Sequence, residues 1–227
     1  MCILCRNSYE DWEYEANLQR VFVTKKLDCL WCKKVTPKDI PSFLLDRIEE
    51  LVVQNCIGFD CIPAMKNLRK LNCGGTSVKE ITGFPLLYEI RASNCRDLFR
   101  IKDIPQLRDL YCTHCPKLKK LVRLPVEVVD CSDCKSLTYI ELSQLYELTC
   151  RRCPIATSIE FPKLAYLDCG DTPVTLIDAE KCPELVSIVA DSTMIKKIRK
   201  FSKLVSLFCD KCSELTSITD LKELSQL

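Results

Sequence analysis

One feature of this sequence constrains its fold more than any other: the same motif recurs about every twenty residues. The motif L-x-x-L-x-C-x-x-C-x-x-L of residues 107–118 returns, position for position, at residues 204–215. Its third apolar position, here called the anchor, recurs at ten places: Cys29, Val53, Cys73, Ala92, Cys112, Cys131, Cys150, Cys169, Ala190 and Cys209. Ten units therefore tile the chain from residue 27 to about residue 220, a short period that is typical of solenoids.

The two halves of each unit carry different patterns. The half around the anchor alternates apolar and polar residues with a period of two, which predicts a short strand with the leucine and the anchor facing inward. The returning half has apolar residues three apart and often ends in proline, which favours a 3₁₀ turn or an extended arch. We therefore expect a mostly β solenoid of about ten repeats, with parallel strands roughly 4.8 Å apart.

These units resemble the leucine-rich repeat, whose signature is L-x-x-L-x-L-x-x-N/C-x-L. Here cysteine commonly replaces the third leucine, and cysteine or threonine replaces the asparagine. The short unit, with its I/L-P-x-L phrase before the strand, is similar to repeats of bacterial effectors and of some giant-virus proteins. The resemblance covers residues 27–227 and implies a right-handed leucine-rich-repeat solenoid. It does not imply one function, because unrelated proteins use this fold.

Three residues past the anchor, the units carry a small thiol or hydroxyl in two versions. One version has cysteine, as at Cys95, and the other, one residue shorter, has threonine, as at Thr76 and Thr172. We expect these side chains to lie beneath a turn and to hydrogen-bond to the backbone of neighbouring units. They would form a ladder along the stack.

The 18 cysteines would indicate a disulfide framework in a small exported chain. This chain is longer and does not begin with a signal-peptide pattern, so we expect free thiols and an intracellular protein. Valine, alanine and threonine fill the repeat positions elsewhere, at Val53, Ala92 and Thr76. Packing volume is therefore the expected role of most repeat cysteines.

Cys2 and Cys5 fit no repeat. With Cys29 and Cys32 they form a C-x2-C-x23-C-x2-C pattern, which is the arrangement of a structural zinc site with a slightly long gap. Cys29 also fits the first repeat as a buried anchor, and a core thiol cannot bind a surface metal at the same time. Both readings stay open: a zinc knuckle shared with the first repeat, or an N-terminal cap with free thiols and no cofactor.

The ends of a stack need covering, because each exposes a strand edge and a slice of core. We expect residues 1–26 to form the N-terminal cap and residues 27–227 to form the solenoid. Within the cap, Val21-Phe22-Val23 predicts a strand that pairs with the first rung. Residues 221–227 begin another unit, so this end is a candidate for self-association or for docking a partner.

The outward strand positions form the candidate binding face, because repeat arrays usually bind partners there. Exposed aromatic residues and a cluster of acidic residues near the C-terminal half would suit a basic protein segment. The candidate binding residues are Tyr111, Asp130, Arg151, Tyr166, Asp168, Asp191, Phe208 and Asp210. The competing interpretation is that these aspartates serve only as turn residues on a solvated surface.

Composition excludes several classes of function. The net charge is only +2, which disfavours nucleic acid and anionic membranes as partners, and no apolar run is long enough for a membrane helix. With five glycines and one histidine, the chain has little material for a phosphate loop or for histidine catalysis. We expect a non-catalytic protein-interaction or scaffold module. The alternatives are a structural component of a larger assembly, such as a giant-virus particle, and a zinc-stabilised or thiol-sensing module.

Overall fold

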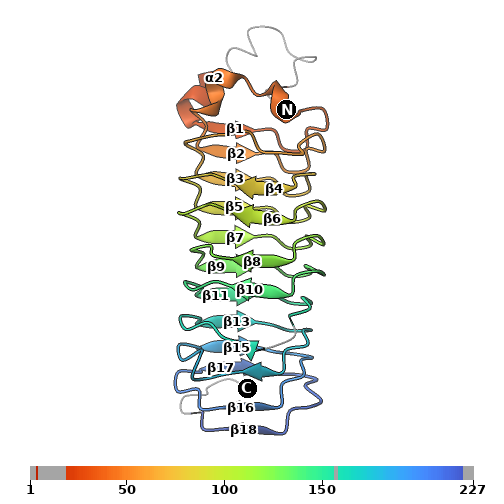
Figure 1. Cartoon of the computed structure of the whole chain (residues 1–227), viewed down its shortest axis with the longest axis vertical. Coiled ribbons are helices and arrows are strands. Elements are labelled where there is room, and N and C mark those ends of the chain that lie inside the picture. Colours follow the sequence, from red (N-terminus) through yellow and green to blue (C-terminus); the bar gives the residue numbers. More distant parts are fainter. Residues whose placement is uncertain (1–3, 5–18, 156–157, 222–227) are drawn as a thin grey trace. The chain divides into compact units, whose positions relative to one another are not determined.

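The computed structural model describes residue 4 and residues 19–155 and 158–221. The chain divides into two compact units, Met1–Cys115 and Pro116–Leu227, and each unit is a stack of parallel strands (Figure 1). The expected division into a cap at residues 1–26 and repeats from residue 27 to 227 stays a prediction.

In the N-terminal unit, five strands pair in parallel and in register. They are β1 (Lys26–Asp28), β2 (Glu50–Val52), β3 (Lys70–Asn72), β5 (Glu89–Arg91) and β7 (Asp109–Tyr111). The central residue of every strand is a buried leucine or isoleucine, and these residues lie opposite one another from rung to rung, as Leu51 does to Leu71. The period-two pattern therefore places its apolar side in the core, as predicted.

The C-terminal unit repeats this arrangement with five more strands. They are β9 (Val128–Asp130), β11 (Glu147–Thr149), β13 (Tyr166–Asp168), β15 (Ser187–Val189) and β17 (Ser206–Phe208). With the five rungs of the other unit, these strands account for the ten predicted repeats. The structure is a parallel β-solenoid with little helix, and the fold prediction is confirmed.

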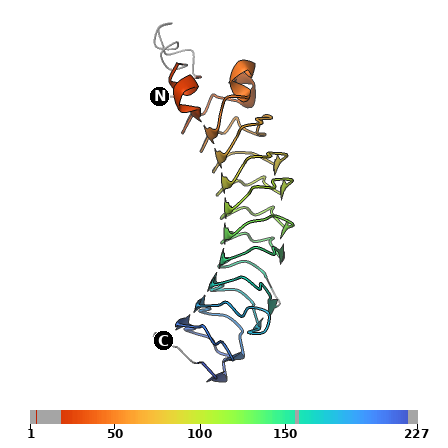
Figure 2. The ribbon, with the colours of Figure 1, turned by 90° about the vertical axis from the view of Figure 1, so that its left-hand side faces the viewer.

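The return arches are more regular than the sequence indicates. In each unit they carry short strands on the side opposite the main strands (Figure 2), and these strands pair two by two. The pairs are β4 (Glu80–Thr82) with β6 (Arg100–Lys102), β8 (Lys120–Val122) with β10 (Tyr139–Glu141), β12 (Ser158–Ile159) with β14 (Leu176–Ile177), and β16 (Lys197–Arg199) with β18 (Ser217–Thr219). The extended alternative therefore holds for most arches. The 3₁₀ segment Pro37–Asp39 and the short helix α2 (Ser42–Leu45) belong to the first long arch.

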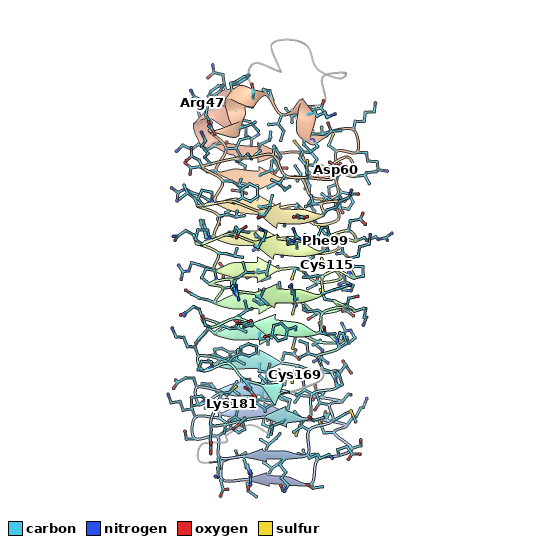
Figure 3. All side chains as sticks on the ribbon, viewed as in Figure 1. Arg47, Asp60, Phe99, Cys115, Cys169 and Lys181 are labelled. Atoms are coloured by element: carbon cyan, nitrogen blue, oxygen red, sulfur yellow. The ribbon has the colours of Figure 1, made fainter. Side chains whose placement is uncertain are left out.

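The core lies between the strands and the arches. The anchors Cys131, Cys150 and Cys169 come from successive rungs of the C-terminal unit and are fully buried, as is Cys112 in the N-terminal unit. Figure 3 shows Cys115 and Cys169 among these interior side chains, each within its own unit. Each buried leucine or isoleucine contributes about 2 kcal/mol of hydrophobic stabilisation, which a single turn of chain could not obtain without its neighbours.

The predicted ladder is present, and its two versions work differently. The cysteine thiols donate to the anchor carbonyl of the preceding rung, with Sγ–O distances of 2.8 Å for Cys56 to Cys29, 3.1 Å for Cys95 to Cys73, 3.2 Å for Cys115 to Ala92, 3.0 Å for Cys153 to Cys131 and 3.0 Å for Cys212 to Ala190. The threonine hydroxyls instead donate to the anchor carbonyl of their own rung, as from Thr76 to Cys73 at 2.7 Å. The expectation of hydrogen bonds to the backbone of neighbouring units was therefore right for cysteine and wrong for threonine, whose hydroxyl meets the next rung at a cysteine thiol, as Thr193 does Cys212 at 3.3 Å.

The predicted strand at Val21-Phe22-Val23 is wrong, because residues 19–24 are helical. The Lys25 N–H donates to the Val21 carbonyl at 2.8 Å, an i to i−4 bond. Val21 is buried, while Phe22 stacks on Phe43 at 6.0 Å between ring centroids. An apolar run of three residues is too short to distinguish the strand period from the helix period, so packing decided the conformation.

Candidate functional site

The outward side chains of the C-terminal unit form one continuous surface, here called the C-terminal strand face. Its first row follows the register of the strands: Asp130, Thr149, Asp168, Val189 and Phe208. Its second row begins two residues later in each rung: Ser132, Arg151, Gly170, Asp191 and Asp210. Seven of the eight predicted binding residues lie on or beside these rows, because the parallel register brings together residues about twenty apart in sequence.

Two arginines neutralise much of the predicted acidic cluster. The Arg151 guanidinium lies 3.0 Å from Asp168 and 3.0 Å from Asp171, and Arg152 holds Asp133 with two hydrogen bonds of 2.8 and 2.6 Å. Partial desolvation lowers the pKa of Arg151, but the charges of Asp168 and Asp171 outweigh it and hold that pKa above its ordinary range. The acidic character of this part of the face is therefore weaker than the sequence indicates.

Aspartates before the anchor also serve the turns. Asp130 Oδ1 accepts hydrogen bonds from the Ser132 N–H at 3.1 Å and the Ser132 hydroxyl at 2.8 Å. Asp168 Oδ1 accepts the Gly170 N–H at 3.1 Å. Such carboxylates satisfy the backbone two residues on, which is ordinary turn chemistry. For Asp130, this role explains the residue type without any ligand.

Two acidic residues further along the face differ from these. Asp191 and Asp210 follow β15 and β17, and neither has an ion pair within the described part of the chain. Asp191 Oδ1 accepts the Asp210 N–H at 2.9 Å, which holds the two turns together. Beside them, Val189 lies opposite Phe208 in register, and the Phe208 ring is 45% exposed. An apolar strip thus borders two carboxylates that pair with no cation among the described residues.

Tyr166 begins β13, opposite Ser187, and forms an aromatic pair that the sequence analysis missed. Its ring meets that of Tyr146 edge-on, with centroids 5.5 Å apart, and both rings are exposed. A hydrogen bond with Tyr166 raises the pKa of Tyr146. Tyr146 escaped prediction because it precedes the strand by one residue and falls outside the alternating pattern.

Tyr111, the remaining predicted binding residue, lies at the end of β7 in the N-terminal unit. Arg91 covers its ring, with the guanidinium carbon 5.0 Å from the ring centroid. Arg91 Nε also donates to Glu89 at 2.7 Å, and Lys70 approaches Glu89 at 3.1 Å. The charges on this part of the N-terminal strand face compensate one another, so it offers less unpaired charge than Asp191 and Asp210 do.

The described residues include only two of the four predicted zinc ligands, Cys29 and Cys32. Cys29 is fully buried as the first anchor, whereas Cys32 is half-buried in the turn, so the CxxC pair is split between core and surface. Cys2 and Cys5 lie outside the described residues. Within residues 19–155 and 158–221, no cluster of three or more cysteine, histidine or acidic side chains is arranged to hold a metal. The zinc knuckle therefore stays a prediction, as does the cap with free thiols.

Two shallow hollows lie on the arches. One lies between β10 and β12 and is lined by Tyr139, Glu141 and Phe161 among others. A second lies between β14 and β16, beside Asp178 and Arg199. The lining of neither includes a cysteine or histidine, so neither presents the nucleophile–base pairs of those residue types.

Comparison with known proteins identifies no family for this chain. No family model matches the sequence, and no curated protein matches it. The solved structures that are similar are leucine-rich-repeat proteins. The leucine-rich-repeat domain of APL1B is 10% identical, with 96% of this chain and 76% of that chain covered and a TM-score of 0.45. A leucine-rich-repeat protein from Bacteroides ovatus is 15% identical, with 80% and 68% covered and a TM-score of 0.43.

Internalin InlF from Listeria monocytogenes is 17% identical, with 82% of this chain and 70% of that chain covered and a TM-score of 0.39. The in-register leucines and parallel strands described above make this chain a parallel β-solenoid whose units resemble leucine-rich repeats. The likeness to giant-virus repeats stays a prediction. Across the part of the chain that the structure describes, no helix is long and apolar enough to cross a bilayer.

Proposed function

We propose that this protein is a non-catalytic interaction module that binds a protein partner through the C-terminal strand face. The observation that carries this proposal is the strip formed by Val189 and Phe208. Beside it, Asp191 and Asp210 have no ion pair within the described part of the chain. Exposed aromatic side chains on a rigid surface are the usual anchors of protein contacts. The parallel strands hold these anchors in place at little entropic cost on binding.

The chemistry of the strip supports a basic segment as the partner. A lysine or arginine of that segment would pair with Asp191 or Asp210, and an apolar side chain beside it would cover Val189 and Phe208. Complementary charges would mainly speed association and select the partner, while the apolar contact would slow dissociation. We further propose an intracellular location, because the cysteines from Cys29 to Cys212 are all free thiols, as is usual in reducing compartments.

The test is affinity capture from cells of the source organism with quantitative mass spectrometry. One double variant, Val189→Thr with Phe208→Thr, removes the apolar strip but keeps residues that favour strands. A second, Asp191→Asn with Asp210→Asn, removes the charge while an amide oxygen at position 191 can still accept the Asp210 N–H. We expect each pair to lower recovery of the same partner about tenfold or more, as losing hot-spot contacts does.

The matched control is Tyr139→Ser, which removes an exposed aromatic ring from β10 on the arch side. Recovery should be unchanged in that variant. If both double variants capture the partner as well as the natural sequence does, the binding site lies elsewhere on the molecule.

A further inference from the structure

Every turn that follows a main strand contains one residue in the left-handed region, two positions past the anchor. In the N-terminal unit, after the first turn, these residues are Asn55, Gly75, Asn94 and His114; in the C-terminal unit they are Asp133, Arg152, Asp171, Ser192 and Lys211. In the first turn the residue is Trp31, with φ of 63°. Asparagine and glycine adopt this conformation readily, whereas a bulky side chain does so at a cost.

The stack imposes this backbone shape whatever the side chain. The Trp31 N–H donates to the Gln54 carbonyl at 3.0 Å, just as the Asn55 N–H donates to Gly74 at 2.7 Å. The conformation is therefore a property of the repeat, and only the choice of tryptophan is particular to this turn. Trp31 is 67% exposed, so hydrophobic burial does not repay the strain. A strained and exposed aromatic residue is a reason to look for a function.

Two other exposed apolar residues lie in the same turn as Trp31 and in the next. Leu30, which precedes it, is 45% exposed, and Ile57, in the corresponding turn of the next rung, is 58% exposed. We call Leu30, Trp31 and Ile57, with Lys33 and Lys34, the Trp31 ridge. Contiguous apolar residues on a turn are more informative than scattered ones, because single exposed hydrophobic residues are common on any surface.

The charge beside the ridge is positive. Lys33 and Lys34 are exposed, and no ion pair joins either of them to another described residue. The acidic side chains nearby are already engaged: Asp28 Oδ1 accepts the Leu30 N–H at 3.1 Å, its other oxygen lies 3.9 Å from Lys26, and Asp39 accepts the Thr36 N–H at 2.8 Å. A partner that contacts the ridge can therefore form ion pairs with Lys33 and Lys34, which pair with no other described residue.

We propose that the Trp31 ridge is a second protein-docking surface, which takes an acidic segment carrying an aliphatic or aromatic side chain. That side chain packs against Trp31 and Ile57, while carboxylates on either side of it pair with Lys33 and Lys34. This surface is separate from the C-terminal strand face in residues and opposite in charge preference. Loss of one does not entail loss of the other.

One substitution tests the ridge without straining the backbone. Trp31→Asn installs the residue that the next turn uses at the same position, so the backbone is relieved rather than disturbed. The probe is a fluorescein-labelled twelve-residue peptide of glutamate and aspartate with one leucine and one phenylalanine, titrated by fluorescence anisotropy. We expect the natural sequence to bind it, and Trp31→Asn and Lys33→Gln/Lys34→Gln each to weaken binding about tenfold or more, as loss of an anchor residue does.

Two controls accompany the titration. Phe99→Ser removes another exposed aromatic ring of the same unit and should bind the peptide unchanged. Thermal unfolding should give Trp31→Asn a Tm equal to or above that of the natural sequence, so that lost binding is not lost folding.

Four results would overturn the proposal. The first is equal binding of a peptide whose acids are replaced by glutamine and asparagine, and the second is no binding of the acidic peptide. The third is preference for a single-stranded oligonucleotide, which would assign the tryptophan and lysines to base stacking and phosphate contacts. The fourth is a dimer, seen by sedimentation without peptide, that Trp31→Asn dissociates, which would make a second copy of the chain the occupant.

Discussion

At the residue scale, cysteine and threonine satisfy the same backbone groups from the same repeat position but with different reach. The longer C–S bond lets Cys95 reach the Cys73 carbonyl one rung away at 3.1 Å, while Thr76 reaches that carbonyl within its own rung at 2.7 Å. One oxygen therefore accepts both side-chain donors, and the Thr76 N–H also reaches it at 3.3 Å. The pair ties adjacent rungs together beneath the turn.

This arrangement predicts that alanine substitution lowers the free energy of unfolding more at a ladder cysteine than at an anchor cysteine. Cys153→Ala removes a thiol that donates to the Cys131 carbonyl at 3.0 Å, whereas Cys150→Ala creates the residue that two other rungs, at Ala92 and Ala190, already have as anchor. Both thiols are buried. We expect Cys153→Ala to lower the free energy of unfolding by about 1 kcal/mol more than Cys150→Ala, the net worth of one hydrogen bond, in urea denaturation. Equal losses would assign the ladder cysteines to packing alone.

At the element scale, a side chain of one rung of the C-terminal strand face packs over a glycine of the next rung. Arg151 of one rung lies across Gly170 of the next on its way to Asp168 and Asp171. A Cβ atom at position 170 would fall 2.5 Å from Arg151 Nη1, closer than real atoms approach. A small residue at one position thus permits an ion pair made by another.

Gly170→Ala should therefore act by displacing the Arg151 guanidinium. Because that end of the side chain is flexible and these ion pairs are partly exposed, we expect a loss of no more than about 1 kcal/mol in the free energy of unfolding. A double-mutant cycle with Arg151→Gln checks the mechanism: the second substitution should add almost nothing to the first. Additive losses would mean that the alanine strains the backbone instead.

At the scale of the whole molecule, a core built around thiols makes stability depend on alkaline pH. Burial raises the pKa of Cys169 to about 12 and the pKa of Cys150 well above its ordinary 9.0. Between pH 9 and pH 12 the unfolded chain has lost the Cys169 proton and the folded chain keeps it, so stability falls as pH rises. A hydrogen bond from the Cys73 thiol acts in the opposite direction on Cys95 and lowers its pKa, so Cys95 does not contribute to this alkaline loss.

The expected loss is about 1.4 kcal/mol per pH unit for each thiol that stays protonated only in the folded state. Urea denaturation from pH 8 to pH 11 measures it. Cys169→Ala should lower the free energy of unfolding at pH 8. It should also make the decline of that free energy above pH 9 less steep by the contribution of one thiol, about 1.4 kcal/mol per pH unit. An unchanged slope in that variant would show that other groups govern the alkaline transition.

The architecture follows from the repeat alone, because units of about twenty residues can bury their apolar side chains only by stacking on one another. The ten rungs, the inward anchors and the thiol ladder all follow from it, since each residue type recurs at the same place in every unit. The eight binding residues were found by the same alternation, although only the C-terminal seven share a surface within one unit, and their role in binding stays a prediction.

Only the tertiary structure decided how side chains on adjacent rungs pair. The sequence indicated an acidic face, but Arg151 and Arg152 neutralise part of it, and Asp191 and Asp210 keep their charge beside Phe208. The helix at residues 19–24, the pairing of the outer strands and the left-handed turn at Trp31 were likewise not predicted. Each depends on hydrogen bonds or contacts between segments about twenty residues apart. The pattern within one segment does not show which residues of the adjacent rung that segment contacts.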